Sequence, residues 1–149
     1  MAKLLILYHS MSGNTRRMAE AVAAGAQEVP DTEVEVKKGL DARLKDLLDC
    51  DGVAFGSPDY FGRMAGGMQN FFDRTYYPAK GRVTGKPCVI FGSAGGSAST
   101  VIRDLRKMVR RFELDEIGEA VGASGNPDEE VLNECRALGR KLAEAAKSP

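Results

Sequence analysis

The residue types best suited to chemistry gather in a short segment near the N-terminus. Its residues, in order, are Ser10, Met11, Ser12, Gly13, Asn14 and Thr15. The segment opens directly into a helical pattern, and a helix N-terminus presents free backbone N–H groups and a partial positive charge. Three hydroxyls beside a glycine that lets the backbone approach an anion closely are more than a helix cap at Ser12 or Asn14 requires. The segment therefore predicts a phosphate-binding loop that needs no lysine.

Two other phosphate loops do not fit this segment. A triphosphate loop ends in Gly-Lys-Ser/Thr, and the dinucleotide fingerprint is Gly-x-Gly-x-x-Gly; neither pattern follows residues 3–8. The only histidine, His9, adjoins the loop. We interpret it as a hydrogen-bonded neighbour rather than a catalyst, and we assign no catalytic side chain.

Two further segments carry residues suited to a flat ring. The first contains Ser57, Pro58, Asp59, Tyr60, Phe61 and Gly62, and the second contains Ser93, Ala94, Gly95, Gly96 and Ser97. Two aromatics between Pro and Gly suit an apolar platform, although Tyr60 and Phe61 could equally pack on their own domain. The small residues allow close approach to a ligand, although a mobile connecting loop would look the same. The prediction of a ring site rests on the spacing of all three segments.

The elements that position these segments alternate along the chain, as in βαβ units on a parallel sheet. Strands are predicted at 3–8, 32–37, 52–56, 87–91 and within 114–123; helices are predicted at about 14–29, 40–48, 64–74 and 100–112, and after Asn126 as a cap with Pro127 first. The alternating 32–37 strand indicates an edge, and the apolar 52–56 strand a central position. The fold class is α/β, a three-layer doubly wound sandwich in which a ligand binds at the carboxyl ends of the strands.

Composition limits the class of protein. The 149 residues predict a single domain over 1–149, and a net charge of zero gives no reason to expect nucleic acid or a membrane as partner. The apolar run at 4–7 is too short for a signal peptide, so we expect a cytoplasmic protein. Cys50, Cys88 and Cys135 are far apart, which predicts buried free thiols and neither a metal site nor a redox dithiol.

Over nearly its whole length the chain resembles the flavodoxin superfamily. Residues 10–15 are similar to the Ser/Thr-x-Ser/Thr-Gly-x-Thr loop of that family, and residues 56–64 resemble the G-S-P-T-Y-F-G-N-M segment of its NAD(P)H:quinone oxidoreductase branch. The resemblance implies a five-stranded parallel sheet in the order 2-1-3-4-5 and one non-covalent FMN. The FMN phosphate would bind to residues 10–15, with the ring between the 57–63 and 93–98 loops.

The chain also departs from that branch. Asp59 replaces the usual threonine and Arg63 the usual asparagine, with opposite expected effects on the flavin potential. The loop insert and the C-terminal histidine of the quinone reductases are absent. The neutral charge and the lack of tryptophan differ from the acidic electron-carrier flavodoxins.

Two functions remain open. The first is an FMN oxidoreductase that takes electrons from NAD(P)H and reduces a quinone or similar small acceptor, with the flavin doing the chemistry. The second is a single-electron carrier that docks on protein redox partners. A response receiver would need acidic residues after residues 3–8, and a low-molecular-weight phosphatase would need a Cys-x5-Arg loop; this chain has neither.

Overall fold

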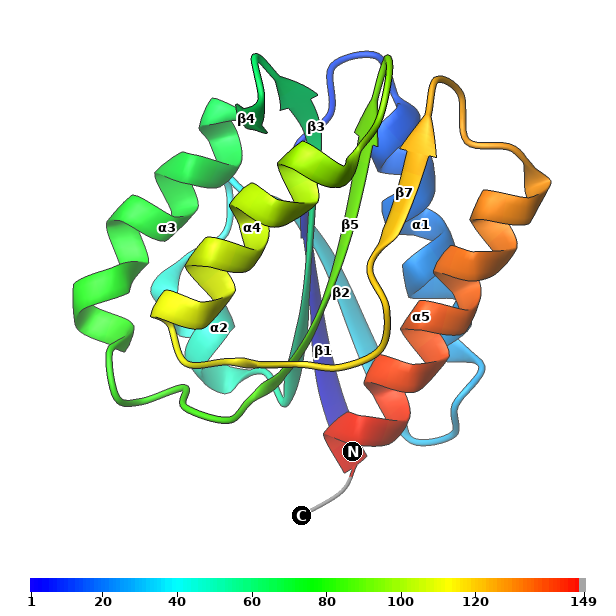
Figure 1. Cartoon of the computed structure of the whole chain (residues 1–149). Helices are drawn as coiled ribbons and strands as arrows, with labels where there is room; N and C mark the ends of the chain where they lie inside the picture. The colour runs from blue at the N-terminus through cyan, green and yellow to red at the C-terminus, as the bar shows by residue number, and fades with distance from the viewer. Residues whose placement is uncertain (148–149) are drawn as a thin grey trace.

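The computed structural model describes residues 1–147, which form alternating strands and helices (Figure 1). The strands are β1 (Ala2–Tyr8), β2 (Thr32–Lys38), β3 (Gly52–Tyr60), β4 (Arg63–Met64), β5 (Pro87–Ala94), β6 (Asp115–Glu116) and β7 (Val121–Ser124). The helices are α1 (Asn14–Gln27), α2 (Leu44–Asp49), α3 (Gly66–Ala79), α4 (Ser99–Arg111) and α5 (Glu129–Lys147).

The sheet has the predicted flavodoxin-like arrangement. Its order is β2-β1-β3-β5-β6, with β7 also paired to β5, and these pairs are all parallel. β2 lies on one side of β1, and β3 and the later strands lie on the other, so the direction in which strands are added to the sheet reverses at β1. The carboxyl ends of β1, β3, β5 and β7 meet at the upper edge in Figure 1, where a ligand site is expected.

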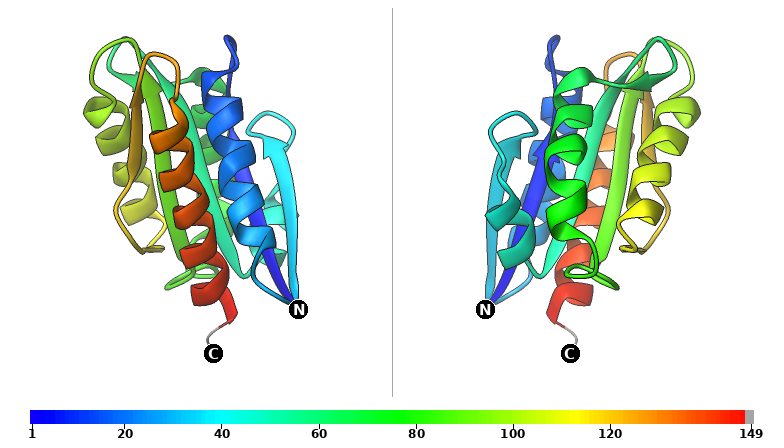
Figure 2. Two further views of the ribbon diagram at one scale, coloured as in Figure 1. Left: turned by 90° about the vertical axis from the view of Figure 1, so that its right-hand side faces the viewer. Right: turned by 90° about the vertical axis from the view of Figure 1, so that its left-hand side faces the viewer.

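Helices cover both faces of the sheet. Figure 2 shows α1 and α5 on one face and α2, α3 and α4 on the other, which confirms the three layers. Each face has its own apolar core: Phe55, Phe71 and Phe72 are fully buried on the α3 side, and Met18 and Leu142 on the α1 side. The sheet that positions the loops is therefore held between two packed layers.

Two central strands run further than the apolar pattern predicts. β3 continues from Gly56 to Tyr60, and β5 continues from Phe91 to Ala94, so part of each predicted loop is strand. After Tyr60 the chain turns back into β4, which pairs antiparallel with β3. Since β4 takes up Met64, α3 begins at Gly66 rather than at the predicted Met64, and it extends to Ala79.

The predicted fifth strand is two short strands. β6 pairs with Pro87–Cys88, and β7 pairs with Phe91–Ala94. Between these two pairings β5 has two residues, whereas the edge segment has four. The extra residues make the edge segment bulge, and the strand is interrupted there.

Two end positions were also predicted wrongly. α5 is capped by Asp128, whose Oδ1 accepts a hydrogen bond from the Val131 N–H (2.9 Å), so Pro127 precedes the cap and Asn126 is not the cap. Leu40 precedes α2 and is exposed, whereas Leu47 carries the buried side of that short helix.

Candidate functional site

The segment predicted to bind phosphate forms the turn between β1 and α1. Gly13 has φ +99°, a conformation that an L side chain rarely adopts, and its N–H donates to Ser10 Oγ (3.0 Å). A hollow of about 210 Å³ lies beside this turn. It is lined by Tyr8, Ser10, Met11, Ser12, Gly13, Arg16 and Lys38. Its lining holds two cations, Lys38 and Arg16, the latter paired with Glu20 (3.3 Å), and no carboxylate, so the outer side of the turn favours an anion. Thr15 lies outside this lining.

A buried hydrogen bond joins the first predicted loop to the third. Thr15 Oγ1 and Ser93 Oγ are 2.8 Å apart, and the two residues are 1% and 4% exposed. Thr15 is the second residue of α1, and Ser93 lies near the end of β5, 78 positions further along the chain. The fold therefore brings together two segments that the sequence could only predict separately.

The second predicted segment forms the β3–β4 hairpin. Its two turn residues, Phe61 and Gly62, have φ +58° and +78°, as a two-residue hairpin of type I′ requires. Asp59 Oδ1 accepts a hydrogen bond from the Gly62 N–H (2.7 Å), which fixes the turn. The Phe61 side chain at the tip is fully exposed. The hairpin therefore holds an aromatic side chain out at the edge where the strands end.

Two side chains hold the base of this hairpin. Ser57 Oγ accepts from the Ala65 N–H (2.8 Å), and Asp104 Oδ2, from α4, accepts from the Met64 N–H (2.8 Å). Asp104 is a supporting residue that sequence reasoning missed, since nothing in the pattern of α4 distinguishes it from other polar positions. It ties the hairpin to the helix that follows the third loop.

His9 lies between the phosphate turn and the hairpin. Its ring meets Tyr60 edge-on with 6.1 Å between ring centres, and a Cβ on Gly67 would lie 2.4 Å from His9 Nδ1. The backbone N–H of His9 donates to the Gly56 carbonyl (3.2 Å). His9 is therefore a packed neighbour of the hairpin, with a backbone hydrogen bond to β3 in place of the predicted side-chain role.

The third predicted segment closes the upper edge. Gly95, Gly96 and Ser97 are exposed, and a Cβ at either glycine would meet nothing within 4 Å. The segment is joined to the loop after β7 through the Gly125 N–H, which donates to the Ala94 carbonyl (2.7 Å). Gly95 and Gly96 are therefore uncovered at this edge of the sheet.

A second contact that the sequence did not predict joins α1 to the loop before α5. Asn14 Nδ2 donates to the Gly125 carbonyl (3.4 Å), and Arg17 donates to Asn14 Oδ1 (2.7 Å) and Asn126 Oδ1 (3.3 Å). The start of α1 is thereby fixed against the loop after β7. Asn126, predicted as a helix cap, has this role instead.

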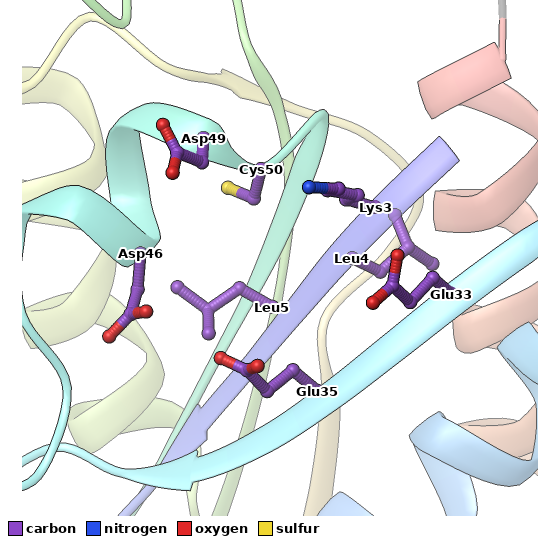
Figure 3. A pocket seen from close by; sticks show the side chains of 8 residues that line it. All are labelled: Lys3, Leu4, Leu5, Glu33, Glu35, Asp46, Asp49 and Cys50. Atoms are coloured by element: carbon purple, nitrogen blue, oxygen red, sulfur yellow. The ribbon is translucent and has the colours of Figure 1, made fainter. Parts of the chain in front are cut away.

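A separate hollow lies beneath α2, beside the first residues of β1 and away from the predicted loops (Figure 3). It is lined by Lys3, Leu4, Leu5, Glu33, Glu35, Asp46, Asp49 and Cys50. Its carboxylates are largely paired within the protein: Lys37 Nζ lies 3.1 Å from both Glu35 and Asp46, and Lys45 pairs with Asp49. Within residues 1–147 no group of three or more His, Cys, Asp or Glu is placed to hold a metal.

The three thiols are free and buried, as predicted. Burial raises the pKa of Cys50 to about 11 and that of Cys135 to about 12, and it raises the pKa of Cys88 further. All three are therefore uncharged near neutral pH. None of the helices described is both long and apolar enough to cross a membrane.

Comparison with known proteins gives a consistent result. The family model described as NADPH-dependent FMN reductase matches residues 30–127. A flavodoxin of Aquifex aeolicus is 35% identical over 97% of this chain and 86% of its own length. An NAD(P)H dehydrogenase (quinone) of Archaeoglobus fulgidus is 32% identical over 99% of this chain and 98% of its own. Among solved structures, a flavodoxin from the domain Archaea superposes with a TM-score of 0.86 at 28% identity, covering 98% of this chain and 99% of its own.

Proposed function

Because this chain belongs to the NADPH-dependent FMN reductase family, we propose that it is an FMN-binding oxidoreductase that takes electrons from NAD(P)H and passes them to a quinone or a similar small acceptor. The observation that carries the proposal is the meeting of three predicted loops at one edge of the sheet. The Thr15–Ser93 hydrogen bond joins two of them, and the hairpin anchored by Asp104 supplies the other.

FMN, when bound, supplies the two-electron chemistry, and the chain's own residues bind and orient it. Residues 10–15 would hold the phosphate through the α1 N-terminus and through the hydroxyl hydrogens of Ser10, Ser12 and Thr15. Residues 57–62 and 94–97 would border the ring, with Tyr60 and Phe61 as apolar surface and exposed backbone groups as hydrogen-bonding partners. No side chain at this edge is required to act as an acid or base.

A flavodoxin-type carrier is the second candidate, and the size of the relatives favours it. The alignment with the Archaeoglobus fulgidus relative extends over 188 positions, so that relative has internal insertions that this 149-residue chain lacks. The Aquifex aeolicus flavodoxin aligns over 160 positions. The length of this chain is therefore nearer to that of the flavodoxin relative, which supports the carrier as the alternative.

An anaerobic visible spectrum separates these functions. We expect purified protein loaded with FMN to be bleached by NADPH or NADH and re-oxidised by a quinone. A spectrum that dithionite bleaches but neither nucleotide changes would support the carrier. Protein that takes up no FMN would overturn both.

The phosphate loop has its own test in Ser12→Glu. Ser12 is exposed, so the fold should be unaffected, but a second anion beside the phosphate should weaken FMN binding by about a hundredfold or more. Thr84→Glu is the matched control, because Thr84 is also exposed and lies in the loop before β5. Equal FMN affinity in both variants would refute the assignment of residues 10–15.

We further propose that the chain acts as one domain in the cytoplasm, with no nucleic-acid partner. Three free thiols support a reducing compartment. The net charge of zero supports the absence of a polyanionic partner.

A further inference from the structure

The buried hydroxyl pair at the site carries an inference that rests on the proposed function. We propose that Ser93 is a positioning residue for the phosphate subsite, which acts through Thr15 and makes phosphate binding depend on the end of β5. Ser93 was predicted to border the ring, but its side chain is directed toward α1 and contacts the Thr15 hydroxyl at 2.8 Å.

The chemistry of the pair explains this role. Each hydroxyl has one hydrogen to donate and two lone pairs to accept, and in the pair either oxygen can be the donor. When Ser93 donates to Thr15, the Thr15 hydrogen is free for another acceptor at the start of α1. An anion at the α1 N-terminus favours the direction in which Ser93 donates to Thr15, because the Thr15 hydroxyl then donates to the charged oxygen, which is a strong acceptor. Ser93 thus holds Thr15 as a donor.

Burial makes the polarity important. Both residues are almost inaccessible, so water does not replace a missing partner easily. Without Ser93 the Thr15 oxygen would lose the donor that fixes its orientation, so its hydroxyl could rotate and donate to a backbone carbonyl of the preceding turn instead of to the phosphate. The effect should depend on the phosphate of the ligand and not on its ring.

The test compares binding of FMN and riboflavin, which differ only in the phosphate. We expect Ser93→Ala to weaken FMN binding about fivefold and to leave riboflavin binding unchanged. Thr15→Val should weaken FMN binding about tenfold or more, and Thr15→Ser, which keeps the hydroxyl, should restore it. The double variant Thr15→Val/Ser93→Ala should bind FMN no more weakly than Thr15→Val alone, because the two residues act in series.

Thr75→Val controls for folding. Thr75 is equally buried, and its hydroxyl donates to the Phe71 carbonyl within α3, away from the site. It should change urea stability without changing the ratio of FMN to riboflavin affinity.

Three results would overturn the proposal. Ser93→Ala could weaken both ligands equally, which would make Ser93 a residue of the ring loop. Ser93→Ala could weaken the binding of neither FMN nor riboflavin. In the double variant, the loss of FMN affinity from Ser93→Ala could add fully to the loss from Thr15→Val. Failure of the unmodified protein to bind FMN would instead overturn the proposed function, so the two failures are distinguishable.

Discussion

Phe61 combines two features that are unfavourable for a folded protein and should be relieved by one substitution. It has φ +58° at the first turn position of the β3–β4 hairpin, and its side chain is fully exposed. Aromatic residues seldom adopt this conformation, whereas asparagine does so readily and is typical of type I′ turns. We therefore expect Phe61→Asn to stabilise the protein.

The magnitude follows from the same two features. A non-glycine residue held in the left-handed region costs about 1 kcal/mol or more. Full exposure of Phe61 means that its removal loses little buried apolar area. The bond from the Gly62 N–H to Asp59 is unaffected by a change at position 61. The expected gain is about 1 kcal/mol, or about 2–4 °C in Tm for a chain of this size.

Urea unfolding of the FMN-free protein measures this gain, because flavin binding would otherwise add to the stability. Phe61→Leu is the control: it keeps an apolar side chain at positive φ and should give no gain. The Asn variant should bind the flavin ring less well, since the exposed aromatic surface is lost. A Phe61→Asn protein that is less stable than the unmodified one would refute the strain argument.

Three further predictions concern the scaffold. Gly25→Ala should destabilise by about 3 kcal/mol in urea unfolding, because its Cβ would lie 1.9 Å from the Arg136 carbonyl of α5, whereas Gly66→Ala, with open space at its Cβ, should be nearly neutral. Burial raises the pKa of Asp46, but hydrogen bonds from the Arg43 N–H and from Lys37 together lower it by more, so the net pKa is lowered. The advantage of the native protein over Asp46→Asn should therefore be full near neutral pH and be lost below about pH 4; a pH-independent difference would contradict this. The buried thiols should react with a disulfide reagent at pH 8 only after unfolding, and fast labelling of folded protein would show that the packing is looser than described.

Local pattern was sufficient for the sheet and most helices. The apolar run at 52–56 and the alternating residues at 32–37 correctly predicted a central and an edge strand, because burial on two faces or one is visible in the residue types. The β3–β4 hairpin was missed for an equally physical reason. Phe61-Gly62 lacks the Asn-Gly or Asp-Gly signal of a type I′ turn, and the conformation is imposed by Asp59 and by anchoring of Met64 to Asp104.

Contacts between distant segments could not be predicted in the same way. The sequence identifies Thr15 and Ser93 as hydroxyls in two separate loops, but whether they meet depends on the relative position of β1 and β5 across the sheet. The same holds for Asn126, whose amide oxygen accepts from Arg17 although its neighbours in sequence suggested a cap. Local signals predict what a residue can donate or accept, and the fold selects its partner.

The fold also decides where Asp59 and Arg63, the two residues that differ from the quinone oxidoreductase pattern, lie relative to a flavin. Opposite charges at positions 59 and 63 suggested opposite effects on the flavin potential, with the sign of the net effect open. In the observed register Tyr60 lies opposite Arg63 and Asp59 lies opposite the buried Met64, so the two charges belong to opposite faces of the ribbon. The Tyr60 ring meets His9 beside the phosphate turn, and Arg63 shares that face while Asp59 is engaged by the Gly62 N–H. Arg63 therefore lies on the face of Tyr60 and Asp59 on the face of Met64, so the two charges would approach a bound ring from different faces of the hairpin.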